Sequence, residues 1–154
     1  MSTTKPPKFL IDEVRGVDLT PWTDILPKNY TILGASLCLD LFLADESGAV
    51  YMLEISAGSI SQIASSEDEF RKSCILDDEG WLLRPLVEAC WEAGMRPNPS
   101  QCYAFTTLPL FGGEYSVSNM WLCSWLEWIS FCGDIYNQTK HLPDGTTIKL
   151  DFVG

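Results

Sequence analysis

The chain has 154 residues, 46% of them hydrophobic, and a formal net charge of −11 at pH 7. This length fits a single domain over residues 1–154, and the aromatic and aliphatic content excludes a disordered tail because it can bury enough apolar surface to offset conformational entropy. The acidic balance argues against direct binding to nucleic acid, since phosphate recognition needs clustered Lys and Arg, and favours either a basic protein partner or simple solubility.

Residues 1–8 form a polar, proline-containing segment that we expect to be flexible. The segment lacks the continuous apolar run of a signal peptide, and no later stretch approaches the roughly 20 apolar residues of a membrane span. These features predict a cytoplasmic protein that does not bind membranes.

The first elements are predicted from turn residues and a change of period. Thr20, Pro21 and Trp22 predict a short helix, with Thr20 as N-cap and Pro21 at the first helical position. Over residues 30–63 the apolar pattern has a period of two, interrupted by glycine-containing turns. This pattern predicts an antiparallel meander built from the runs YTIL, LCLDLFLA, VYMLEI and SISQI.

One acid interrupts the apolar run LCLDLFLA. Alternation puts Leu41 on one face of the strand and both Asp40 and Phe42 on the other. Asp40 is therefore either exposed to solvent or located in a pocket beside Phe42. We favour a solvated or backbone-bonded carboxylate over a functional one.

Two helices and a strand should follow the meander. Ser66 and Glu69 have the spacing of a capping box, which predicts a helix to about residue 74. A second helix is predicted by apolar residues at helical spacing and by a glycine that can end it; these residues are Trp81, Leu82, Leu86, Cys90, Ala93 and Gly94. Residues 103–106 are expected to form a strand.

The last third of the chain is the most informative. Gly112 and Gly113 indicate positive φ or close approach of another segment, and a strand is expected to include Tyr115, Val117 and residues 120–123. A capping box, Ser124 with Glu127, predicts a helix to about residue 140 that is buried on more than one side. Within this helix Gly133 predicts a close contact with the sheet, and residues 142–146 and 147–152 predict a turn and a final short strand.

The sequence offers little support for catalysis. His141 is the only histidine and lies next to a Pro-Asp-Gly turn, where a surface residue is expected. The paired glycines lack the context of a phosphate-binding loop, and the tryptophans at 121, 125 and 128 lack the interleaved basic residues that base stacking on nucleic acid requires. We therefore expect no catalytic residue, no cofactor and no enzyme activity.

The cysteines also fit a core better than a metal site. The six residues Cys38, Cys74, Cys90, Cys102, Cys123 and Cys132 contain no C-x-x-C pair and no ligand spacing with the single histidine. Free cysteine is among the most buried residue types. We expect six reduced, buried thiols and no bound metal.

Charge is concentrated in one part of the chain. Between Ser66 and Glu92 there are eight acids and three basic residues, a net charge of −5. Such a segment is either a solvated helix face or an acidic docking surface, and the sequence leaves both open.

The pieces LCLDLF, VYMLEI followed by IASSEDEF, PLFGGEYSVSN, FCGDIYNQ and LPDGTTI occur in this order over roughly residues 20–150. In that order they resemble the C-terminal domain of type VI secretion immunity proteins, a branch similar to the SUKH superfamily of toxin-neutralising proteins. The resemblance implies an α+β domain with a central, mainly antiparallel sheet flanked by helices. It also implies a non-catalytic inhibitor that binds a co-expressed toxin, often a nuclease. We expect the free protein to be a monomer.

Combining this resemblance with the charge predicts a basic toxin as partner and an acidic contact surface. The candidate partner-binding residues are Glu67, Asp68, Asp77, Asp78 and Glu79, with Glu114 and Tyr115 on an exposed loop as further candidates. Two alternatives remain open. One is a small-molecule-binding or enzymatic domain that uses a cavity behind the Gly112–Gly113 loop, and the other is a general protein-interaction domain.

Overall fold

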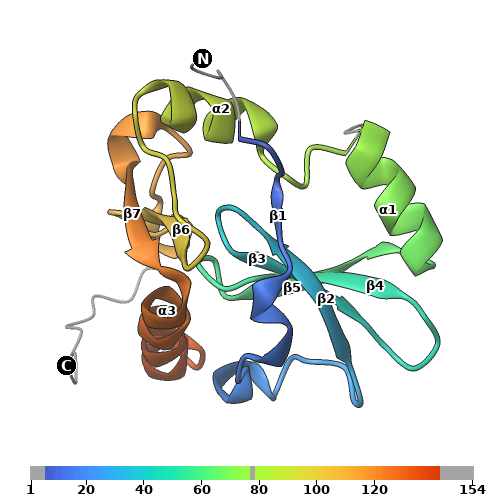
Figure 1. The fold of residues 1–154 in the computed structure, drawn as a ribbon. Helices are drawn as coiled ribbons and strands as arrows, with labels where there is room; N and C mark the ends of the chain where they lie inside the picture. Colours follow the sequence, from blue (N-terminus) through green and yellow to red (C-terminus); the bar gives the residue numbers. More distant parts are fainter. Residues whose placement is uncertain (1–5, 77–78, 143–154) are drawn as a thin grey trace.

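The computed structural model describes residues 6–76 and 79–142 (Figure 1). Its strands are β1 (Leu10–Ile11), β2 (Thr31–Ser36), β3 (Asp40–Ala44), β4 (Val50–Glu54), β5 (Ser59–Ala64), β6 (Gln101–Phe105) and β7 (Met120–Ser124). The α-helices are α1 (Glu67–Leu76), α2 (Arg84–Glu92) and α3 (Trp125–Thr139), and four short 3-10 helices are η1 (Glu13–Gly16), η2 (Thr20–Trp22), η3 (Pro109–Phe111) and η4 (Val117–Asn119), all within the described part of the chain.

The predicted meander is confirmed. Strands β1 to β5 form one antiparallel sheet in which spatial order follows chain order. The short loops between them make this the simplest topology, because antiparallel neighbours can be joined by tight turns. β6 and β7 form a second, two-stranded antiparallel sheet. The α+β class is thus confirmed, with the strands of the described residues divided between two sheets rather than joined in one.

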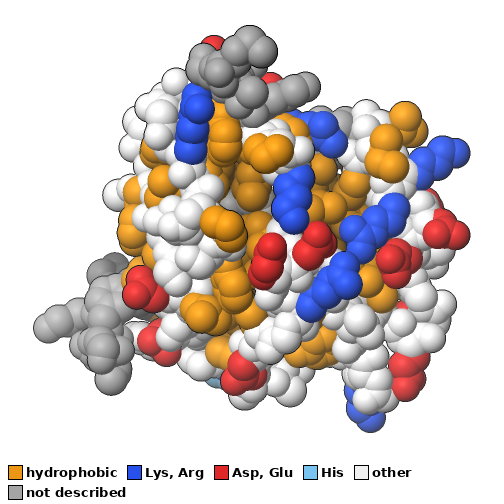
Figure 2. Space-filling view, viewed as in Figure 1, with side chains coloured by type: hydrophobic (Ala, Val, Ile, Leu, Met, Phe, Trp, Pro, Cys, Tyr) orange, Lys and Arg blue, Asp and Glu red, His pale blue; other side chains and the backbone are white. Residues whose placement is uncertain are grey.

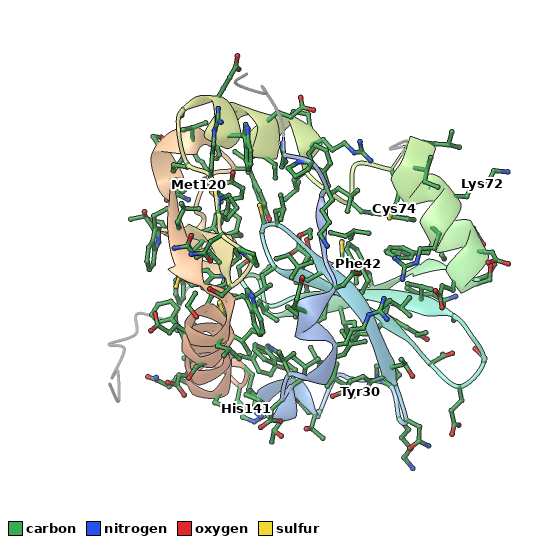
Figure 3. The ribbon with its side chains drawn as sticks, in the orientation of Figure 1. Tyr30, Phe42, Lys72, Cys74, Met120 and His141 are labelled. Carbon is green, nitrogen blue, oxygen red and sulfur yellow. The ribbon has the colours of Figure 1, made fainter. Side chains whose placement is uncertain are left out.

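The five-stranded sheet separates two apolar clusters. On one face Phe42 packs with Phe70 and Cys74 of α1, and Figure 3 shows Phe42 and Cys74 pointing into the space between sheet and helix. On the other face Leu41 and Leu43 join a larger cluster with residues from α2, α3 and the second sheet. In Figure 1 α1 accordingly lies on the opposite side of the molecule from β6, β7 and α3. The alternation expected along β3 therefore matches the two cores.

The helix starts follow from local hydrogen bonds. The backbone N–H of Glu69 donates to Ser66 Oγ at 3.1 Å, so Ser66 caps α1 as expected. The carboxylate of Glu69 accepts from Ser65 rather than from Ser66. Ser124 caps α3 in the same way, accepting from the backbone N–H of Glu127.

Three local predictions are wrong. Thr20 does not cap η2 because its hydroxyl donates to the Asp18 carboxylate, and it is itself the first residue of that 3-10 turn. Tyr115 and Val117 precede β7, since residues 117–119 form η4 instead of extending the strand. Trp81 also lies before its helix, because α2 begins only at Arg84.

The prediction for Gly112 and Gly113 is confirmed, and the close contact predicted at Gly133 exists but is made with a different element. Gly112 has φ +83°, and a Cβ at Gly113 would collide with the carbonyl of Thr107, so the pair supplies both positive φ and close approach. A Cβ at Gly133 would lie 2.7 Å from Pro21 Cγ. The close contact of α3 is therefore made with η2 and not with the sheet.

All six cysteines are buried and free, as a core role predicts. His141 is exposed, as expected. Within residues 6–76 and 79–142, no helix has the length and apolar content needed to cross a membrane. The predicted strand 147–152 and most of the predicted turn before it lie outside the described residues.

Candidate functional site

A pocket of about 280 Å³ lies where the start of β3, the end of β4, the segment before α2 and the loop before β7 meet. We call it the acidic pocket. Its lining residues are Asp40, Met52, Glu54, Glu79, Gly80, Trp81, Leu83 and Tyr115. Three of them carry carboxylates, and none of these lining residues is basic.

Asp40 is placed at the pocket by the tight turn between β2 and β3. Leu39 adopts a left-handed conformation with φ +64° and donates its N–H to the carbonyl of Ser36 at 2.9 Å. The backbone N–H of Asp40 then donates to the buried Ser36 hydroxyl at 3.1 Å. A left-handed leucine is strained, and such strain persists only where the surrounding fold holds it.

The side chain of Asp40 is buried, contrary to the solvated position we favoured from the sequence. Its residue is only 7% exposed and lies on the same face of the strand as Phe42. Burial, and secondly the nearby carboxylate of Glu54, raises the pKa of Asp40 to about 8. At neutral pH the free protein therefore holds Asp40 mainly as the neutral acid.

Glu54 faces Asp40 directly across the sheet, because the two residues are register partners in the antiparallel pair β3–β4. Side chains at opposed positions have Cβ atoms about 4.5–5.5 Å apart, and like charges placed there are destabilising. One carboxylate oxygen of Glu54 accepts from Ser59 Oγ at 3.1 Å. The pair thus concentrates acidity at one point of the sheet.

The segment before α2 supplies a second wall. Gly80 and Leu83 both have left-handed backbones, with φ +72° and +52°, and Leu83 N–H donates to the carbonyl of Gly80 at 3.2 Å. Trp81 stacks on Phe70, with ring centroids 5.9 Å apart. This stacking fixes Trp81 to the core beneath α1 and leaves Glu79 exposed at the pocket.

Tyr115 supplies the third wall. Its ring meets Phe105 edge to face, with centroids 5.3 Å apart, and the residue is 49% exposed. Partial burial, and next the carboxylates of Asp40 and Glu54, raise the pKa of Tyr115. The phenol therefore stays neutral and can donate a hydrogen bond at the pocket.

Asn119 holds the loop that carries Tyr115. Its side-chain nitrogen donates to the carbonyls of Thr107 at 2.9 Å and Glu114 at 2.8 Å, and its side-chain oxygen accepts from Thr107 N–H at 2.8 Å. The loop is also joined to the first sheet, because Leu110 N–H donates to the carbonyl of buried Ser56 at 3.2 Å. These contacts make the pocket wall a fixed part of the fold.

The predicted contact residues divide by position. Glu79 and Tyr115 line the acidic pocket. Glu67 and Asp68 are exposed in the first turn of α1, and Glu67 pairs with Arg71 at 3.4 Å. This turn is about 15 Å from the far end of α1, after which Glu79 follows in the chain. Glu114 is exposed beside Tyr115 but is not part of the lining, and Asp77 and Asp78 lie outside the described residues.

Charge elsewhere is mixed. On the face shown in Figure 2, acidic and basic side chains are interspersed around apolar ones. A groove of about 540 Å³ with mainly apolar lining lies beside α3 and β7, where Trp121 is 45% exposed. Glu127 is the one acid among the seven described residues that line this groove.

The chemistry of the acidic pocket suits a cation with apolar parts. Among the described residues, no group of three or more His, Cys, Asp and Glu side chains is arranged to hold a metal ion. The acids are instead bordered by the rings of Trp81 and Tyr115 and by Met52 and Leu83. Aromatic faces attract cations and pack against aliphatic stems, so an organic cation fits better than a bare ion.

The sequence patterns did not assign three residues of this region, Asp40, Glu54 and Asn119, to the site. Asp40 carried a usable signal, an acid inside an apolar run, although its environment stayed open. Glu54 could have been found as its opposed partner once the hairpin register was known, but a register needs the fold. Asn119 carries no signal in the sequence, because its hydrogen bonds reach residues up to 12 positions away.

Residues 65–136 match the family model described as T6SS immunity protein Tdi1, C-terminal. The resemblance to type VI secretion immunity proteins is confirmed over this segment. No curated protein matches the chain. The immunity-type segment contributes Glu79, Trp81 and Tyr115 to the acidic pocket, whereas Asp40 and Glu54 precede it.

Proposed function

We propose that the protein binds and neutralises a cognate toxin of a type VI secretion system in the cytoplasm. The observation that carries this proposal is the match of residues 65–136 to a family of immunity proteins. An immunity protein acts by binding, which agrees with the one-histidine sequence and with a pocket built from acids and aromatic rings.

The charge of the protein supports a basic toxin. A net charge of −11 steers positively charged partners and repels acidic ones. A nuclease presents basic residues to phosphates, so an acidic inhibitor that covers this surface also blocks its substrate. We propose a nuclease-type effector whose substrate surface is occluded by this protein.

Within this proposal the predicted contact residues have two roles. Glu79 and Tyr115 belong to the centre of the interface, because they line the acidic pocket together with buried Asp40. Glu67 and Asp68 are exposed on α1 and act mainly by long-range attraction, as rim charges affect association rate more than affinity. Glu114, Asp77 and Asp78 are assigned to the same outer group.

The test is binding and protection with the toxin domain encoded beside this gene. Purified protein should form a stable complex with that domain, and co-expression should restore growth of cells that produce it. Association measured at two salt concentrations should be slower at the higher one, because screening weakens charge steering. If the two proteins do not bind and growth is not restored, the proposed function is wrong.

A further inference from the structure

We infer that the acidic pocket receives one arginine side chain of the toxin, with the guanidinium placed between Asp40, Glu54 and Glu79 and the stem against Trp81 and Tyr115. This inference rests on the proposed function and names the chemistry of the contact. It comes from the geometry of the pocket rather than from the family match, since two of the three acids precede the matched residues.

Asp40 is buried at the pocket, with 7% of the residue exposed. Among the described residues, its one hydrogen bond with another side chain is donated by its own backbone N–H to Ser36 Oγ. The described residues supply no donor to its carboxylate, although it lines an open pocket. A carboxylate that meets no protein donor and borders an open pocket can accept hydrogen bonds from a group that enters the pocket.

The acidic pocket collects carboxylates from β3, β4 and the segment before α2. Glu54 opposes Asp40 across β3 and β4, and Glu79 and Tyr115 line the same pocket. Asp40 also contributes to the raised pKa of Cys38 and Cys132, and both of these are buried thiols. No basic side chain of the described residues lines this pocket, so its acids have no positively charged neighbour in the lining.

The lining of the pocket favours arginine over lysine. A guanidinium is planar, weakly hydrated and able to donate five hydrogen bonds, which suits several carboxylates beside aromatic rings. An ammonium keeps more of its hydration and lacks the flat face that stacks on Trp81 or Tyr115. The volume of about 280 Å³ is below the range of roughly 300–1,000 Å³ typical of drug-sized ligands, which fits a single side chain.

Arginine entry has a consequence for protons. The free protein holds Asp40 largely protonated at neutral pH because its pKa is raised to about 8. A guanidinium beside the carboxylate favours the charged form and lowers this pKa, so binding releases the proton of Asp40 to solvent. The carboxylate that remains pairs with the bound cation.

The first experiment uses a small probe and needs no toxin. N-acetyl-arginine amide is titrated into the full chain, and two-dimensional NMR follows the indole N–H of Trp81 and the amide of Gly80. N-acetyl-citrulline amide is the matched control, because it has nearly the same shape without the charge. We expect saturable shifts with the arginine compound only. Equal shifts with both compounds, or none with either, would overturn the inference.

Single-residue variants test whether the arginine compound binds in the acidic pocket. Asp40→Asn should abolish the saturable shifts, and Glu92→Gln, which removes an exposed acid at the end of α2, should leave them unchanged. Asn resembles the protonated acid in shape, so Asp40→Asn should keep the native spectrum. Glu54→Gln serves as a second variant and should weaken binding at least several-fold, in line with one lost charge-assisted contact. Unchanged binding in both pocket variants would contradict the inference.

The second experiment uses the toxin domain encoded beside the gene. Calorimetry at pH 7 in buffers of different ionisation enthalpy measures protons released on binding. The wild type should release close to one proton more than Asp40→Asn. If the toxin binds with equal proton release in both, the inference fails and the proposed function stands. If the arginine compound binds but the toxin does not, the proposed function fails and the pocket remains a site for arginine-like cations.

Discussion

Asp40 and Glu54 are register partners across β3 and β4, so two acids face each other at one end of the central sheet. Asp40 is buried there, and Glu54 is half-buried. Burial and the opposed Glu54 carboxylate disfavour the charged form of Asp40, so deprotonation of Asp40 costs stability.

The pair predicts a stability that falls as pH rises. The pKa of Asp40 increases from 3.8 to about 8 on folding, so the folded state binds this proton more tightly than the unfolded state does. The stability of the wild-type protein therefore falls as the pH rises from about 3.8 to about 8. Asp40→Asn does not titrate. The difference in free energy of unfolding, Asp40→Asn minus wild type, should therefore increase by about 2–5 kcal/mol from pH 4 to pH 8, since one pKa unit corresponds to about 1.4 kcal/mol.

Urea unfolding of both proteins at several pH values measures this difference. Comparing the variant with wild type at each pH removes the contribution of the other titrating groups. A difference that stays constant with pH would show that the pKa of Asp40 is not raised in the folded state.

Asn119 should be essential for the position of Tyr115. Asn119→Ala removes three hydrogen bonds that join Thr107 and Glu114, and we expect a loss of about 1–3 kcal/mol of stability. Ser118→Ala is the matched control, because Ser118 is exposed in the same 3-10 turn. Chemical denaturation gives the stability, and the ring signals of Tyr115 report the loop. Equal effects of the two variants would contradict the role of Asn119.

Gly133 should tolerate no larger residue. A Cβ there would lie 2.7 Å from Pro21 Cγ and 3.5 Å from Trp22 Cη2, so Gly133→Leu forces η2 away from α3. Overpacking of this kind costs about 1–3 kcal/mol. Gly16→Ala is the control, because a Cβ at Gly16 meets no atom within 4 Å. A Gly133→Leu protein that melts at the wild-type temperature would show that the contact is loose.

The chain should unfold as one cooperative unit that needs neither disulfide nor metal. All six cysteines are free and buried, and burial raises the pKa of Cys38, Cys102 and Cys132, which keeps these thiols protonated and unreactive. Thermal melts followed by fluorescence and circular dichroism should coincide and should change little with reductant or chelator. Two separate transitions would instead indicate more than one domain.

The outer acids should affect association more than folding. Reversing Asp77 and Asp78 to Lys should slow binding to the toxin domain and weaken its salt dependence, because it removes negative charge that attracts a basic partner. Reversal of Glu67 and Asp68 in the first turn of α1 should act in the same direction. Stopped-flow measurements at two salt concentrations provide the rates. An unchanged rate in both variants would assign these acids to ordinary solvated surface.

The sequence by itself determined the features that arise from near neighbours. Alternation along LCLDLFLA placed Phe42 opposite Leu41, and Ser66 and Ser124 marked the helix starts, because pleat period and capping depend on residues a few positions apart. The order of short motifs also indicated a resemblance to immunity proteins, and residues 65–136 match a model of that family.

Only the tertiary structure decided what surrounds each residue. Asp40 is buried because the segment before α2 and the loop before β7 meet over the start of β3, and Gly133 contacts η2 rather than the sheet because α3 packs there. The same packing separates Glu67 from Glu79 and brings Glu79 to Tyr115, which is 36 positions further along the chain. Such contacts depend on the balance of many weak interactions across the whole core, and no local pattern encodes them.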